Sequence, residues 1–106
     1  MLISANYPKL DNVTSQTAVS VSGTGSKTLL AFSNKRLGAI IYNSGGQTAY
    51  INYGSSVNSA SGCVAAIAAG TSYSLSSGAP CWVGQVVGYA PASTGTTLVV
   101  TDLSEA

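Results

Sequence analysis

Short runs of alternating hydrophobic and polar residues fill most of the chain, and clusters of Gly, Ser, Asn and Pro separate them. Alternation at period two is typical of β-strands that bury one face. The pattern predicts about eight short strands and no helix of ordinary length. The predicted strands are 17–22, 27–32, 37–43, 47–53, 63–69, 71–75, 81–89 and 96–103. This spacing favours a single all-β domain, a β-sandwich or jelly roll of antiparallel strands.

Two segments of this pattern carry local signals. The strongest is a hairpin over residues 37–53, because Ser44-Gly45-Gly46 is a turn of the kind that permits positive φ. Residues 63–69 are open to two interpretations. Their alanine-rich run suits a helical turn, since Ala has the best helix propensity. Their short length between two glycines favours a strand.

The first 16 residues show no regular period, so we expect an N-terminal arm over 1–16 and the sandwich domain over 17–106. This start has neither the basic residues nor the apolar run of a signal peptide. No apolar run approaches the ~20 residues of a membrane helix. We therefore expect a protein that is made and used without a cleaved signal and that contacts no membrane.

Charged residues are scarce: the chain has four Lys and Arg, three Asp and Glu and no His, and none lies between Leu37 and Thr101. The net charge of +1 provides no field that attracts nucleic acid. One interpretation is a Ser- and Thr-rich solvated surface. The other is a surface that contacts protein, because large permanent interfaces are depleted in Lys, Glu and Asp. We favour the second, a repeated structural component of a symmetric assembly.

The residue inventory offers little chemistry. Without His, the candidates for acid–base catalysis are three carboxylates and three lysines. The many serines have no His that could act as a base to activate them as nucleophiles. Cys63 and Cys81 do not complete a zinc site. We therefore expect no enzyme, no metal and no cofactor. The two cysteines form either a disulfide or, as we favour, two buried thiols, since their spacing is not that of a redox pair.

The basic pair Lys35-Arg36 has three interpretations: a solvated loop, a dock for an acidic patch on a partner, or an ion pair between Arg36 and Asp102. The aromatic residues suit sugar stacking or protein packing. We favour packing, because the tyrosines occur about one per strand and no two are grouped in a loop as a binding platform needs. The candidates for a subunit interface are Tyr50, Tyr53 and Trp82.

A series of short motifs runs through residues 34–102. It comprises Asn34-Lys35-Arg36, Ile40-Ile41-Tyr42-Asn43, Tyr50-Ile51-Asn52-Tyr53-Gly54, Ala69-Gly70-Thr71-Ser72-Tyr73, Trp82-Val83-Gly84-Gln85-Val86 and Leu98-Val99-Val100-Thr101-Asp102. This series resembles small β-sandwich virion proteins of tailed bacteriophages, in particular head decoration (cement) proteins. The resemblance covers residues 34–102 and rests on alternation and turn glycines.

The resemblance implies a non-enzymatic protein that binds the outside of a phage capsid, commonly as a trimer, at junctions of the major capsid protein. It implies assembly in the host cytoplasm and a final place on the virion surface. Capsid contacts would come from the arm and the basic loop: Ile3, Tyr7, Pro8, Lys9, Asp11, Lys35 and Arg36. Two alternatives remain: a receptor- or glycan-binding module, such as a tail-fibre tip or lectin-like domain, and another head or tail accessory protein.

Overall fold

The computed structural model describes residues 13–23, 26–54, 63–75, 82–91 and 95–104. Within these ranges the chain forms eight strands and no helix, so this part holds no helix able to cross a membrane. The strands are β1 (Val13–Val21), β2 (Lys27–Leu30), β3 (Arg36–Asn43), β4 (Ala49–Tyr53), β5 (Ala65–Ile67), β6 (Ser72–Leu75), β7 (Val86–Tyr89) and β8 (Thr96–Ser104).

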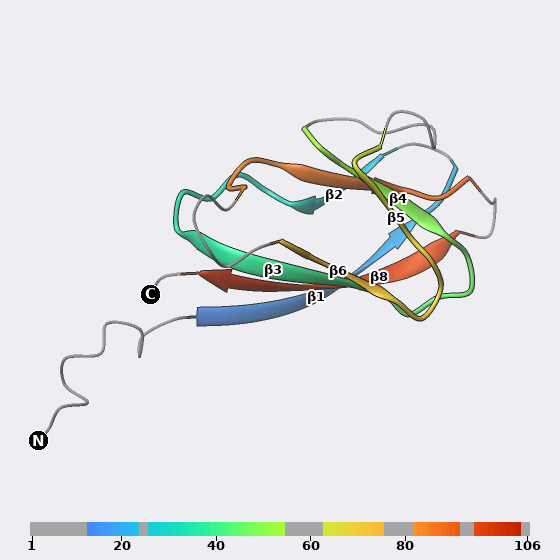
Figure 1. Ribbon diagram of the computed structural model, residues 1–106, viewed down its shortest axis with the longest axis horizontal. Helices are drawn as coiled ribbons and strands as arrows, with labels where there is room; N and C mark the ends of the chain where they lie inside the picture. Colours follow the sequence, from blue (N-terminus) through green and yellow to red (C-terminus); the bar gives the residue numbers. More distant parts are fainter. Residues whose placement is uncertain (1–12, 24–25, 55–62, 76–81, 92–94, 105–106) are drawn as a thin grey trace, which may run out of the picture.

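The strands form two four-stranded antiparallel sheets that face each other (Figure 1). The first sheet has the order β1-β8-β3-β6 and the second has the order β2-β7-β4-β5. This is the strand order of a jelly roll, in which the chain crosses between the sheets at nearly every connection. Among the described strands, β4 and β5 are the only consecutive pair that are hydrogen-bonded neighbours. The expected all-β sandwich is therefore confirmed.

The hairpin predicted over residues 37–53 is wrong. Strand β3 pairs with β6 and β8 in the first sheet, whereas β4 pairs with β5 and β7 in the second. The turn between them carries the chain across the sandwich. Gly45 is also not among the glycines with positive φ. It is needed because a Cβ there would collide with Thr96 Oγ1, so glycine lets the turn lie against β8.

Strand boundaries differ most from the predictions in three strands. Strand β1 begins at Val13 rather than Thr17, so residues 13–16 belong to the sandwich and not to the arm. The sequence does not alternate between hydrophobic and polar residues here, because Thr14 to Ala18 are exposed on both faces of the strand. Residues 63–69 contain a strand, but only the three residues of β5. Strand β7 begins at Val86, because residues 82–85 leave the sheet.

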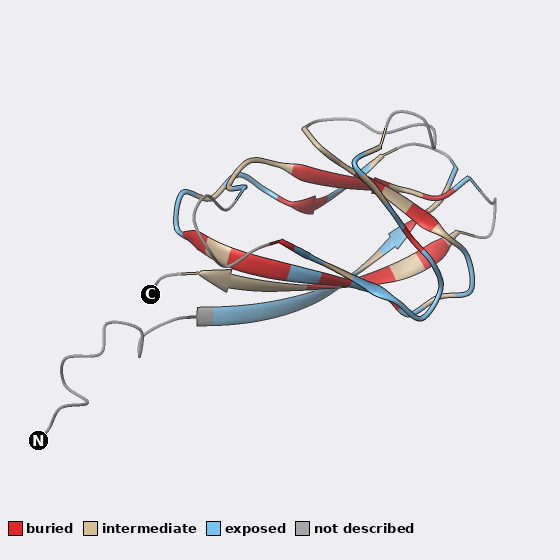
Figure 2. Cartoon of the chain, in the orientation of Figure 1, coloured by how far each residue is buried: buried red, intermediate tan, exposed pale blue. Residues whose placement is uncertain are grey.

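The core lies between the two sheets and consists of aliphatic side chains from their inner faces (Figure 2). Its most deeply buried large members are Ile41, Ile51, Ile67, Leu98 and Val86. Burial of one such side chain contributes about 1.5–3 kcal/mol. Strand β1 is the exception to this pattern, because its side chains are exposed over most of its length (Figure 2).

One polar side chain, Asn43, sits fully buried at the end of β3. Its Nδ2 donates to the main-chain oxygens of Gln47 (2.6 Å) and Ile67 (2.8 Å). Its Oδ1 accepts from Gly45 N (3.1 Å) and Thr96 Oγ1 (2.7 Å). These four bonds use the full capacity of an amide side chain. They join β3, β8, the crossing turn and the end of β5, which explains why the chain crosses here instead of forming a hairpin.

Candidate binding surface

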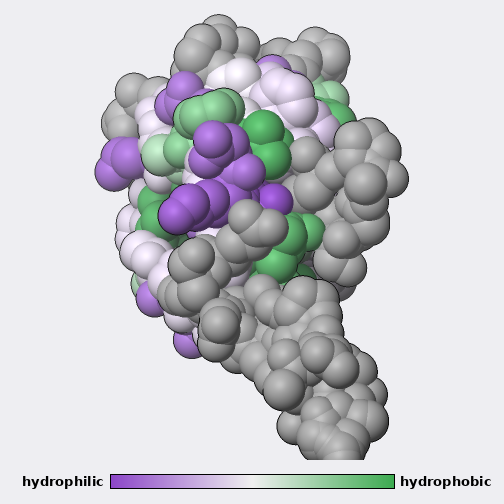
Figure 3. Space-filling view, turned by 90° about the vertical axis from the view of Figure 1, so that its left-hand side faces the viewer, coloured by the Kyte–Doolittle hydropathy of each residue, from purple (hydrophilic) through white to green (hydrophobic). Residues whose placement is uncertain are grey.

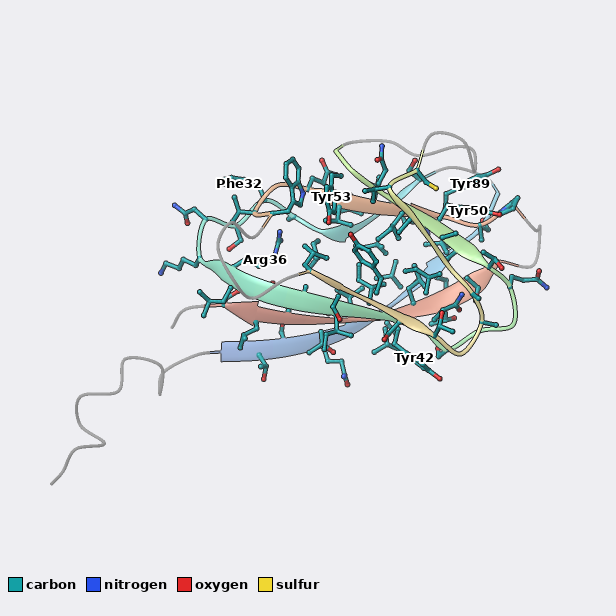
Figure 4. All side chains as sticks on the ribbon, viewed as in Figure 1. Phe32, Arg36, Tyr42, Tyr50, Tyr53 and Tyr89 are labelled. Atoms are coloured by element: carbon teal, nitrogen blue, oxygen red, sulfur yellow. The ribbon has the colours of Figure 1, made fainter. Side chains whose placement is uncertain are left out.

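Arg36, at the start of β3, fastens two connecting segments to the sandwich. Its Nη1 donates to the main-chain oxygens of Trp82 (3.1 Å) and Gly84 (3.0 Å), and its Nη2 donates to Ala31 O (2.5 Å). The residue is only 4% exposed, and Figure 4 shows it pointing from β3 into the space between the sheets. The rigid fork of the guanidinium suits this role, since it presents several donors in fixed directions.

The charge of Arg36 is balanced by Asp102 on β8. Arg36 Nε lies 3.4 Å from Asp102 Oδ1, and neither atom has a hydrogen-bond partner among the described residues. The pairing of Arg36 with Asp102, one of the three interpretations of the basic loop, is therefore confirmed. The prediction of Arg36 as a capsid contact is wrong, because its guanidinium is buried and forms hydrogen bonds inside the sandwich. Of the basic pair, only Lys35 is exposed.

Trp82, whose main-chain oxygen accepts from Arg36, is 40% exposed. Its ring stacks on Tyr53, with centroids 5.0 Å apart and planes inclined by 13°. Its Nε1 donates to Gln85 O (3.0 Å), and a Cβ on Gly84 would lie 2.5 Å from its Cζ2. The Tyr53 hydroxyl in turn bonds the Tyr73 hydroxyl of the opposite sheet (2.8 Å). The orientation of the half-exposed indole is therefore fixed by its neighbours.

Phe32, between β2 and β3, is 68% exposed, more than any other large hydrophobic residue that the structure describes. Its segment lies beside that of Trp82, because Ser33 N donates to Val83 O (2.8 Å) and Arg36 binds both segments. We call Phe32, Lys35, Tyr53 and Trp82 the aromatic end. Figure 3 views the molecule from this side and shows hydrophobic and hydrophilic side chains next to each other.

The aromatic end extends the sequence-based expectation in two respects. Tyr53 and Trp82 were predicted as candidates for a subunit interface, and the structure stacks their rings on each other. Phe32 was missed, although a bulky aromatic residue beside a polar turn was the available signal. The third interface candidate, Tyr50, lies elsewhere, opposite Tyr89 on the second sheet. That cross-strand pair agrees with the expected tyrosine packing.

Several predicted residues lie outside the described part of the chain. They are Ile3, Tyr7, Pro8, Lys9 and Asp11 of the arm, together with Cys81. Cys63 is half-buried.

A second surface feature is a hollow of about 530 Å³ on the outer face of the first sheet, lined mainly by Gly38, Ile40, Ser74, Thr101 and Leu103. Its lining carries no charged side chain. A ligand site normally adds a few polar groups that converge on one position. The aromatic end is therefore the stronger candidate for binding.

The described residues contain no group of three or more His, Cys, Asp or Glu able to hold a metal ion. What the aromatic end offers is apolar ring surface and one ammonium group, which suits binding to another molecule. No protein-family model, curated protein or solved structure matches this chain.

Proposed function

We propose that the protein is a non-enzymatic structural protein of a tailed bacteriophage, which binds the outside of the capsid and stabilises it. The observation that carries this proposal is the aromatic end, where Phe32 and Trp82 are exposed on a frame fixed by buried Arg36. Aromatic residues are enriched at protein interfaces, and Trp and Tyr are enriched among the residues that dominate binding energy. Covering Phe32 alone would contribute about 1.5–3 kcal/mol.

Two further features support a protein partner. The stretch from Leu37 to Thr101 has no charged residue, which matches the depletion of charge in the centre of protein interfaces. The motif series of residues 34–102 resembles decoration proteins. The jelly-roll fold does not decide between functions, because it occurs in both viral capsid and lectin domains. In this proposal the partner is the major capsid protein, and Lys35 is the exposed cation beside the contact.

Glycan binding is the second candidate, and the exposed indole of Trp82 favours it. Tyr53 already covers one face of that ring, and Gly84 lies against it. The indole's own donor is used by Gln85 O. A sugar site needs several polar groups directed at one position, and the described aromatic end supplies Lys35 alone as a charged group. The geometry therefore ranks glycan binding below protein binding.

The test is co-sedimentation of the purified protein with DNA-filled capsids from its source lysate. Phe32→Ser removes the most exposed ring, and Val64→Ser is a matched control at a residue that is 45% exposed. We expect Phe32→Ser to weaken capsid binding roughly 10- to 100-fold, as 1.5–3 kcal/mol implies, and the control to bind like the wild type.

Equal capsid binding by both variants would remove the aromatic end from the contact. Absence of the protein from particles in the lysate would refute the decoration proposal. A shift of Trp82 fluorescence on addition of a sugar panel would then favour the glycan candidate.

A further inference from the structure

The four sheet edges of the sandwich differ in how they are protected. Strands β5 and β6 are short edges of three and four residues. Strand β2 has four residues, begins with Lys27 and contains a register shift between Thr28 and Leu30. Short length, lysine and bulges are the devices by which natural proteins prevent an edge from pairing with another chain. Three of the four edges therefore carry protection.

Strand β1 carries none of these devices. Its nine residues pair with β8 in an unbroken register, from Val13 opposite Ser104 to Val21 opposite Thr96. The strand contains no charged residue, no Pro and no Gly. At about 3.4 Å per residue it presents an edge of about 30 Å. It is the longest edge of the sandwich and the one with no barrier to pairing.

The outward edge of β1 pairs with no other strand in the described part of the chain. Strand β1 is the terminal strand of its sheet, so every second residue directs its main-chain N–H and C=O away from β8. Residues 14–18 are all exposed, and the cartoon is pale blue along this stretch (Figure 2). Because successive side chains of a strand point to opposite faces, this part of β1 is covered on neither face, whereas Val19 and Val21 at its other end pack on the core. Residues 14–18 therefore gain little from their own domain, because packing rather than propensity stabilises strands.

We infer that the β1 edge binds a second copy of this chain, with β1 of each subunit pairing antiparallel about a two-fold axis. The pairing would join the two four-stranded sheets into one continuous sheet of eight strands. Full-length pairing places Thr17 of one subunit opposite Thr17 of the other. An antiparallel ladder of this length provides about eight to ten main-chain hydrogen bonds, which matches the ~10 of a standard interface.

Two properties of the chain select a second copy as the occupant. Self-pairing about a two-fold axis brings identical side chains close together, and β1 has no charge that would repel its own copy. The pairing also closes the assembly. Once β1 is covered, both edges of the joined eight-stranded sheet are β6 strands, which have only four residues each. The assembly therefore stops at two copies and does not extend into a fibre.

This inference places the subunit contact at β1 and not at Tyr50, Tyr53 and Trp82, and it specifies a dimer in place of a trimer. It does not rest on the proposed function. It concerns the purified protein alone, whereas capsid binding requires capsids, so either can fail while the other holds.

The test is the mass of the full-length protein by sedimentation velocity over a wide range of concentration. The variant Gln16→Lys/Ala18→Lys puts lysines on β1 at two exposed positions, on the same face of the sheet as Ser72 and Ser74. The matched control, Ser72→Lys/Ser74→Lys, puts them at two exposed positions of β6, the opposite edge of the same sheet. We expect wild type and control at twice the 10.6 kDa chain mass and the β1 variant at the single-chain mass, with unchanged circular dichroism in all three.

Hydrogen exchange provides a second measurement on the same proteins. Pairing protects the outward amides of β1 in the wild type, and the β1 variant loses that protection. A wild type that sediments as a single chain at every concentration overturns the inference, even if its β1 amides are protected, because another segment then covers the edge. A mass of three chains, or a dimer that survives the β1 lysines, also overturns it.

Discussion

The change Asn43→Asp isolates the buried amide that links the two sheets. The two side chains have nearly the same shape, so the substitution creates no cavity. Oδ1 keeps its bonds from Gly45 N and Thr96 Oγ1. The position of Nδ2 becomes an oxygen that faces the carbonyl oxygens of Gln47 and Ile67, which lie 2.6 and 2.8 Å away.

The magnitude follows from those two contacts. Two hydrogen bonds worth about 1 kcal/mol each are lost, and the Ile67 carbonyl, whose bond is buried, loses this donor at about 1–3 kcal/mol. The expected loss in the free energy of unfolding is therefore about 3–5 kcal/mol. Small domains unfold with about 5–15 kcal/mol in total, so this one change removes much of the stability.

Urea unfolding followed by far-ultraviolet circular dichroism measures the effect. Asn34→Asp is the control, because it makes the same change at an exposed position in the β2–β3 connection. Its expected effect is within about 0.5 kcal/mol of zero. Should Asn43→Asp fail to fold, Thr96→Val removes a single donor to Oδ1 and should cost about 1–2 kcal/mol. Equal stability of Asn43→Asp and Asn34→Asp would refute the structural role of this amide.

The remaining predictions concern Arg36 and three glycines. Arg36→Lys keeps the charge but loses the guanidinium fork that binds three carbonyl groups, and thermal unfolding should show a destabilisation of about 3–6 kcal/mol, the value of two lost hydrogen bonds from a charged group. Gly70→Ala has open space at φ +78° and should cost about 1–2 kcal/mol in urea unfolding, whereas Gly95→Ala, at φ +69°, also collides with a main-chain oxygen and should cost more. Equal costs would contradict the collision. Gly84→Ala should displace the indole of Trp82 and shift its fluorescence emission, and an unchanged spectrum would contradict the contact.

The strand content was predictable because alternation is a local property, and each of the eight strands overlaps a predicted one. The pairing of strands could not be predicted in this way, because it depends on contacts between residues that are far apart in the sequence. The turn Ser44-Gly45-Gly46 is compatible with a hairpin and with a crossing between sheets. The side chain of Asn43 decides between them through Thr96, which is 53 residues further along the chain. No turn signal contains that information.

The candidate surface was predictable only in part, for the same reason. Tyr53 and Trp82 were identified separately, but their stacking depends on the segment 82–85 leaving the sheet. Arg36 causes that departure by taking the main-chain oxygens of Trp82 and Gly84. The sequence suggested Asp102 as a partner for Arg36, but it did not indicate that the guanidinium also binds three carbonyl groups.

The scarcity of charge connects the two proposals. The β1 edge has no charged side chain, so covering it needs no costly removal of water from ions, and the aromatic end has a single charged group, Lys35, beside its rings. They use different parts of the sandwich, since β1 borders the first sheet while Tyr53 and residues 82–85 belong to the second sheet and its connection. A dimer joined at β1 therefore keeps two aromatic ends available. If both proposals hold, each contact centred on Phe32 would be weak, but two contacts on one rigid sheet would bind a repeating capsid surface together, and the gain would come from effective concentration without any new contact.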